Sequence, residues 1–131
     1  MTDQTYSGYP SSNIDALTFD RKKINALLDS VSKSFTGAYA DLTSKEDEVK
    51  KENAKLYLYF KNDATKRSAE EIKALIINDP LMKRLLEELS DAKTKHLHWK
   101  VEWEKLKTKI MLLQSEVRQN IEFNSLSGKY D

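Results

Sequence analysis

The chain has 131 residues, 33% charged and 39% hydrophobic, with three glycines, two prolines and no cysteine. This composition is typical of long helices and argues against a sheet, whose turns need Gly, Asn and Pro. The absence of cysteine excludes disulfides and thiolate chemistry. The sequence has neither an apolar run of membrane-spanning length nor a secretory signal pattern, so we expect a cytoplasmic protein. The formal net charge of +1 does not by itself indicate a nucleic-acid-binding protein.

The amino-terminal residues are polar and include Gly8 and Pro10, which predicts a disordered arm over residues 1–13 before a single helical domain over residues 14–128. A first long helix is predicted over residues 14–61, because its apolar residues alternate at spacings of three and four. Two polar residues, Lys45 and Glu52, interrupt this heptad stripe, and Gly37 lies beside it as a tolerated interior glycine or a local break. The stripe consists of Ile24, Leu28, Val31, Phe35, Ala38, Leu42, Val49, Leu56 and Tyr59.

A basic loop is predicted over residues 61–67, followed by a short helix. Ser68 and Glu71 have the spacing of a capping box, and the short helix is expected to carry Ile72, Leu75 and Ile76 on one face. Asp79 is predicted to cap the next helix, with Pro80 at its first position.

The third helix is predicted over residues 79–122, with a heptad stripe that continues for more than five repeats. Further apolar residues flank the stripe, so we expect an all-α fold in which the two long helices form an elongated hairpin that oligomerises. The flanking residues are Leu81, Leu86, Leu97, Val101, Leu112 and Ile121. The stripe consists of Met82, Leu85, Leu89, Ala92, His96, Trp99, Trp103, Leu106, Ile110, Leu113, Val117 and Asn120. The core and oligomerisation residues are expected to include Leu28, Phe35, Leu42, Trp99, Trp103, Leu106 and Ile110.

The two tryptophans have two interpretations: packing within the stripe, or direct stacking on a ligand such as a base. His96 and His98 differ by about 200° around a helix, so they do not chelate one ion from the same helix, and no metal site is expected. No cofactor and no enzymatic activity are expected, because the chain has no glycine-rich phosphate loop and no nucleophile elbow.

Lysines gather in two stretches. Residues 93–109 carry six lysines against two glutamates, which is the pattern either of a solvated helix face or of a binding surface. In the second stretch, lysines alternate with Tyr57, Tyr59 and Phe60, a pattern suited to single-stranded nucleic acid if these rings do not instead pack at the end of the hairpin. The predicted DNA-binding residues are Lys50, Lys51, Lys55, Lys61, Lys66 and Arg67.

Four segments together resemble the phage UvsY-type recombination mediators: AKLYLYFKND, AEEIKALIINDPLM, WEKLKTKI and RQNIEFNSLSG. The stretch from Glu71 to Asp79 is the most specific part, and the resemblance covers residues 14–128. It implies a cytoplasmic, ring-like homo-oligomer, in the host cell if the protein is from a phage. Such a protein binds single-stranded DNA and helps to load a RecA-like recombinase onto strands coated by single-strand-binding protein.

The resemblance places the DNA-binding positions around Asn53 and Lys55, where Asn53 departs from the basic residue expected. Lys50, Lys51 and Lys61 are candidates to supply the missing charge. The alternative interpretation is a structural coiled-coil scaffold, adaptor or virion protein without a DNA-binding role, which the near-neutral net charge favours.

Overall fold

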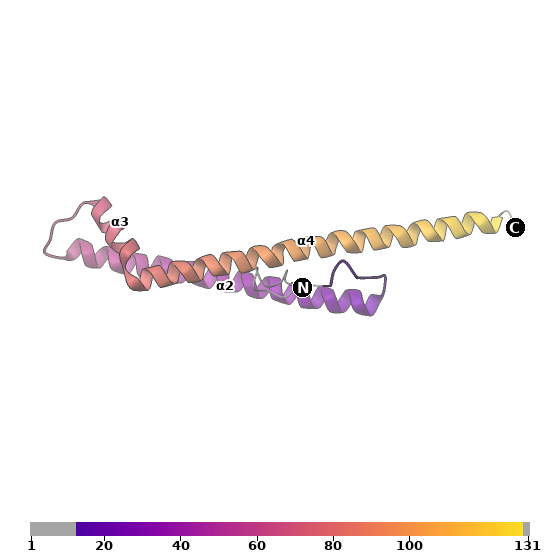
Figure 1. The fold of residues 1–131 in the computed structure, drawn as a ribbon, viewed down its shortest axis with the longest axis horizontal. Coiled ribbons are helices and arrows are strands. Elements are labelled where there is room, and N and C mark those ends of the chain that lie inside the picture. Colours follow the sequence, from indigo (N-terminus) through magenta and orange to yellow (C-terminus); the bar gives the residue numbers. More distant parts are fainter. Residues whose placement is uncertain (1–12, 130–131) are drawn as a thin grey trace. The chain divides into compact units, whose positions relative to one another are not determined.

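A computed structural model describes residues 13–129 of the chain, with side chains described as far as residue 125. Three α-helices follow one another: α2 (Arg21–Asn62), α3 (Ala69–Asn78) and α4 (Pro80–Lys129) (Figure 1). Residues 13–129 contain no strand. The prediction of an all-α chain with two long helices joined by a short one is therefore confirmed. The arm predicted over residues 1–13 lies outside the described residues, except for Asn13.

The first long helix begins later than the heptad pattern predicted, because Asp20 caps it. The Asp20 carboxylate accepts hydrogen bonds from the backbone N–H groups of Lys22 and Lys23 at 3.0 and 3.3 Å, which are otherwise unpaired donors of a first helical turn. Before this cap the chain forms a turn that buries Ile14 and Leu17. Ile14 and Leu17 thus contribute to the core without being helical.

The short connections follow the predicted capping chemistry. The Ser68 hydroxyl accepts the Glu71 N–H at 3.2 Å and the Glu71 carboxylate accepts the Ser68 N–H at 3.4 Å, which completes the capping box of α3. Asp79 then accepts the Met82 N–H at 3.0 Å at the start of α4. Asp79 also ends α3, since its own N–H donates to the Ile76 carbonyl at 3.1 Å.

The chain divides into two compact units, each built from parts of both long helices. Unit 1 comprises residues 13–36 and 98–129 of the described chain, and unit 2 comprises residues 37–97. Helix α2 continues through Gly37, so no local break occurs there. No neighbouring side chain requires a glycine at this position, since an added Cβ would meet none within 4 Å.

Unit 1 has its core along the predicted stripes. Val31 and Leu106 are almost fully buried, and the Phe35 and Trp103 rings stack with centroids 6.4 Å apart. Trp99 is also buried, whereas Asn120, predicted at the end of the stripe, is exposed. Beyond Val117 the described side chains of α4 have no covering element, which explains why the stripe ends there. Of the expected core residues in unit 1, Trp99 and Leu106 are buried, and Leu28, Phe35, Trp103 and Ile110 are half-buried.

In unit 2, α3 folds back over the end of α2. Its Ile72 and Ile76 form a buried cluster with Met82, against which Val49, Leu56 and Phe60 pack. Tyr59, predicted in the stripe, is instead 67% exposed. This part of the stripe prediction is wrong because α3 covers the side of α2 that carries Phe60. Leu42, another expected core residue, is half-buried.

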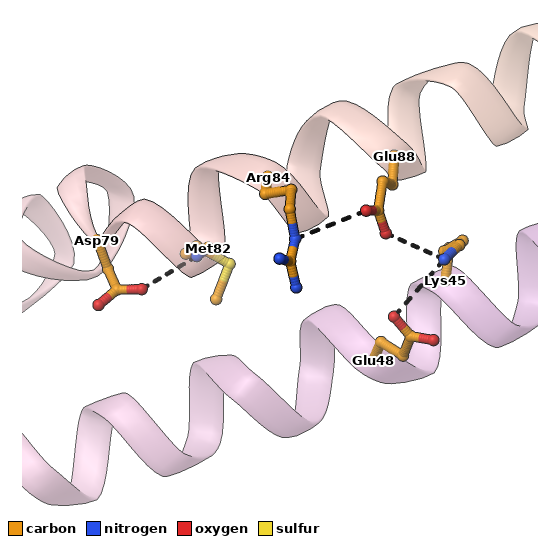
Figure 2. Close-up of polar contacts among 6 residues, drawn as sticks. All are labelled: Lys45, Glu48, Asp79, Met82, Arg84 and Glu88. Carbon is orange, nitrogen blue, oxygen red and sulfur yellow. Dashed lines mark hydrogen bonds and ion pairs between the residues drawn. The ribbon is translucent and has the colours of Figure 1, made fainter.

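The polar interruption at Lys45 has a partner on the other long helix. The Lys45 ammonium lies 3.0 Å from the Glu88 carboxylate on α4 and 3.8 Å from Glu48, and Arg84 approaches Glu88 at 3.7 Å (Figure 2). The hydrogen bond to Glu88 is the main cause that raises the pKa of Lys45 above 10.5. Together with the ring contact between Tyr39 and His96, this pair shows that α2 and α4 are antiparallel in unit 2.

Candidate nucleic-acid interface

The six predicted DNA-binding cations all lie in unit 2, at the carboxyl-terminal end of α2 and in the loop before α3. Residues 50–67 contain these six cations and only two carboxylates, those of Glu52 and Asp63. Except for Arg67, the cations are exposed. The end of α2 is therefore a positively charged part of unit 2.

The helix distributes these cations over two faces. Lys51 and Lys55 lie one turn apart and share their face with Leu58 and Asn62, because spacings of three and four return to the same side of a helix. Lys50 and Lys61 lie on a different side. The lysines predicted as one cluster thus form two neighbouring rows along the last turns of α2.

The lysines also differ in their ionic partners. Lys51 pairs with Asp47 at 3.0 Å, but both side chains are largely exposed, and such a pair contributes little stability. Among residues 13–129, no carboxylate lies within ion-pair distance of Lys50, Lys55 or Lys66. These three ammonium groups are therefore available to an anionic ligand without the loss of an existing bond.

Arg67 differs from the five lysines in having several contacts within the chain. Its guanidinium donates to the Phe60 carbonyl at 3.2 Å and to the Asp63 carboxylate at 3.1 Å, and lies 5.4 Å from the centroid of the Phe60 ring. The Arg67 side chain is only 18% exposed. Arg67 thus fixes the loop to the end of α2, and its charge is directed at Asp63.

The same contact determines the charge state of Asp63. The hydrogen bond from Arg67, followed by that from the Thr65 backbone N–H, lowers the pKa of Asp63 below 3.8. Asp63 is therefore an anion at neutral pH, with Arg67 beside it. Since Arg67 is paired with Asp63, the remaining positive charge of this region comes from the lysines.

The aromatic residues of this region are not equivalent. Tyr59 is 67% exposed, whereas Tyr57 is 38% exposed and has the Lys61 ammonium 5.6 Å from its ring centroid. Phe60 packs against the buried cluster of unit 2 and meets Tyr59 edge-on. Only Tyr59 of the three has a largely exposed ring.

A shallow groove of about 560 Å³ runs beside Tyr59 along the end of α2. Lys55, Leu58, Asn62 and Asp63 line the rest of it. Leu58 and Asn62 were not predicted as site residues, although their spacing from Lys55 on a helix indicates the shared face. The groove therefore combines a cation, an aromatic ring, an aliphatic side chain and an amide.

The second lysine-rich stretch, residues 93–109, has another arrangement. In unit 1, Lys105 pairs with Glu102 at 3.4 Å and Lys107 pairs with Glu104 at 3.1 Å. Trp99 is buried and contacts His98 edge-on with centroids 4.9 Å apart. The part of this stretch in unit 1 has the features of a solvated helix face over a packed aromatic core.

Among the described residues, no group of three or more His, Asp or Glu side chains has an arrangement that could hold a metal ion. The helices of residues 13–129 include none with the length and apolar character needed to cross a membrane. No family model, no curated protein and no solved structure matches this chain.

Proposed function

We propose that this protein binds single-stranded DNA as a homo-oligomer and acts as a recombination mediator. The observation that supports this most directly is the end of α2 in unit 2. Three lysines there and in the following loop have no carboxylate partner among the described residues, and the exposed Tyr59 lies beside one of them, Lys55. Lysines neutralise phosphates, and exposed aromatic rings stack on unpaired bases.

The charge pattern favours single strands over duplexes. One protomer offers few phosphate contacts, so its own affinity is weak, and an oligomer repeats the lysines so that one flexible strand engages several copies. Duplex DNA has a persistence length of about 150 base pairs and does not follow a tight path between copies without a large bending cost. Binding is expected to be sequence-tolerant, because neither phosphate contacts nor stacking reads a base sequence.

Exposed apolar residues support self-association. In unit 1, Val101, Leu112 and Phe123 are 48%, 56% and 69% exposed, and their spacing of eleven residues, about three turns, places them on one side of α4. In unit 2, Leu86 and Leu97 are exposed with the same spacing. Burial of these side chains against other copies would be favourable.

The mediator role rests on the resemblance to UvsY-type proteins. On this proposal, the oligomer holds a single strand that is coated by single-strand-binding protein and helps a RecA-like recombinase to assemble on it. Such a role needs a surface that binds the backbone of the strand independently of its base sequence. The exposed lysines at the end of α2 support this role, because lysines neutralise phosphates whatever the base sequence.

The test is a titration of the purified protein with labelled single-stranded and duplex DNA of equal length at several salt concentrations. Light scattering on the same samples gives the oligomer mass. We expect an assembly larger than a dimer, a preference for the single strand, and an affinity that falls steeply with salt. A second assay measures how fast a RecA-like recombinase assembles on strands coated by single-strand-binding protein, with and without this protein.

Three results would contradict the proposal in different ways. An oligomer that binds no DNA at low salt would favour the structural coiled-coil scaffold instead. DNA binding without faster recombinase assembly would remove the mediator role and leave the binding function. A stable monomer would remove the oligomer.

A further inference from the structure

We infer that the groove beside Tyr59 is a base-stacking subsite, in which one unpaired base lies on the Tyr59 ring while the adjacent phosphate binds Lys55. This inference rests on the proposed binding of single-stranded DNA and names the residues that would contact the bases. It selects one of three neighbouring aromatic rings. The selection follows from what already covers each ring.

Two of the three rings have a cation against them within the chain. Lys61 lies 5.6 Å from the Tyr57 centroid, and Arg67 lies 5.4 Å from the Phe60 centroid. A cation over the face of a ring is attracted by its quadrupole, so a base would have to displace it. Phe60 also packs against the core of unit 2, which removes more of its surface from any ligand.

Tyr59 is free of this competition. Its ring meets that of Phe60 edge-on, at a centroid distance of 5.2 Å and an interplanar angle of 78°. Such a contact involves at most one face of the Tyr59 ring, and the residue as a whole is 67% exposed. The other face is therefore available for a base.

The groove provides the remaining contacts that a nucleotide needs. Lys55 lines it and has no carboxylate at ion-pair distance among residues 13–129, so its ammonium complements a phosphate. Asn62 offers one amide donor group and one acceptor, which suit the edge of any base. Asp63, the acidic residue of the groove, is paired with Arg67 at 3.1 Å, which reduces its repulsion of the phosphate.

The experiment compares two strands with the same phosphates, one with ordinary bases and one made of abasic units. The variants are Tyr59→Ala, the matched control Tyr57→Ala on another face of the same helix, and Tyr59→Phe, which keeps the ring. Circular dichroism and light scattering establish that each variant has the helix content and mass of the wild-type protein.

We expect the wild-type protein to bind the base-containing strand at least about fivefold more tightly than the abasic strand, because stacking contributes about 1–3 kcal/mol per base. Tyr59→Ala should remove this preference while it keeps the affinity for the abasic strand. Tyr57→Ala and Tyr59→Phe should both retain the preference.

The inference is overturned if Tyr59→Ala keeps the preference for bases, or if Tyr57→Ala abolishes it equally. Equal binding of both strands by the wild-type protein would also overturn it, while leaving the proposed DNA binding intact. Failure of the wild-type protein to bind either strand would overturn the proposed function as well.

Discussion

Residues 50–67 and residues 98–109 have a similar composition, lysines interleaved with aromatic residues, but they differ in the exposure of the rings and in the ionic partners of the lysines. In the stretch in unit 2, Tyr59 is exposed and Lys55 has no ionic partner among the described residues. In the stretch in unit 1, Trp99 is buried, and Lys105 and Lys107 are each held by a glutamate three residues away along α4.

Composition alone therefore does not identify a binding surface. A lysine beside an intrahelical glutamate has part of its field cancelled, and a buried ring offers no face to a base. A lysine without a partner beside an exposed ring offers both. The two stretches are therefore expected to have separate roles, packing and assembly in unit 1 and ligand binding at the end of α2 in unit 2.

The largest expected effect is the loss of stability on removal of a buried ring. Trp99→Ala should lower the free energy of unfolding by about 3–5 kcal/mol, as for other large buried side chains replaced by alanine. Tyr59→Ala, at an exposed position, should change it by no more than about 0.5 kcal/mol. Urea denaturation followed by circular dichroism measures both. Equal effects would show that the two rings do not differ in packing.

The next effect is on assembly. The double variant Leu112→Lys, Phe123→Lys places charges on the exposed apolar side of unit 1 and should raise the protein concentration needed for assembly about tenfold or more, since burial of such a side chain contributes about 1.5–3 kcal/mol. Gln114→Lys, about 200° around α4 from Leu112, is the matched control and should assemble normally. Sedimentation over a concentration series gives the result. Unchanged assembly of the double variant would place the interface elsewhere.

A smaller effect concerns the salt dependence of DNA binding. Lys50→Ala with Lys55→Ala should reduce the slope of log affinity against log salt by about 1.4, since each phosphate contact on a single strand contributes about 0.7. Lys100→Ala with Lys107→Ala removes two lysines from the other stretch and should leave the slope unchanged. If both pairs flatten the slope equally, the lysines of the two stretches do not differ in DNA binding.

The smallest effect concerns the loop contact between Asp63 and Arg67. Because the pKa of folded Asp63 is lowered, its contribution to stability is fully present above the ordinary value of 3.8 and is lost as the pH falls through the lower folded value. Asp63→Asn should lack this acid-dependent loss. The same variant removes a carboxylate from the groove and should bind single strands slightly more tightly at neutral pH. Melting temperatures over an acid titration measure the first effect, and a flat wild-type profile below 3.8 would contradict it.

Much of the helical architecture was predictable because its signals are local. The capping box of Ser68 and Glu71 and the Asp79–Pro80 start of α4 each depend on residues within one turn. The start of α2 was predicted too early. Ile14 and Leu17 continue the hydrophobic pattern, although the helix begins only after the Asp20 cap. Hydrophobic spacing reports burial, and a buried turn satisfies it as well as a helix does.

The position of the cation-rich segment was predictable, but the contacts of its side chains were not. The run of cations from Lys50 to Arg67 is visible in the sequence. The contacts of Arg67 with Phe60 and Asp63 are not visible in the sequence. They depend on where α2 ends and on how the following loop brings Arg67 back to it.

Residue type and spacing along the chain were enough to predict the helical fold, the cap of the short helix and the segment that concentrates positive charge. The inward packing of Phe60 and the exposure of Tyr59 depend instead on tertiary contacts, since the return of α3 determines which side of α2 is covered. The tertiary structure also decided which lysines are paired with carboxylates. Side-chain exposure and charge pairing depend on neighbours that are distant in sequence, so the rings and cations available to a ligand were settled by packing.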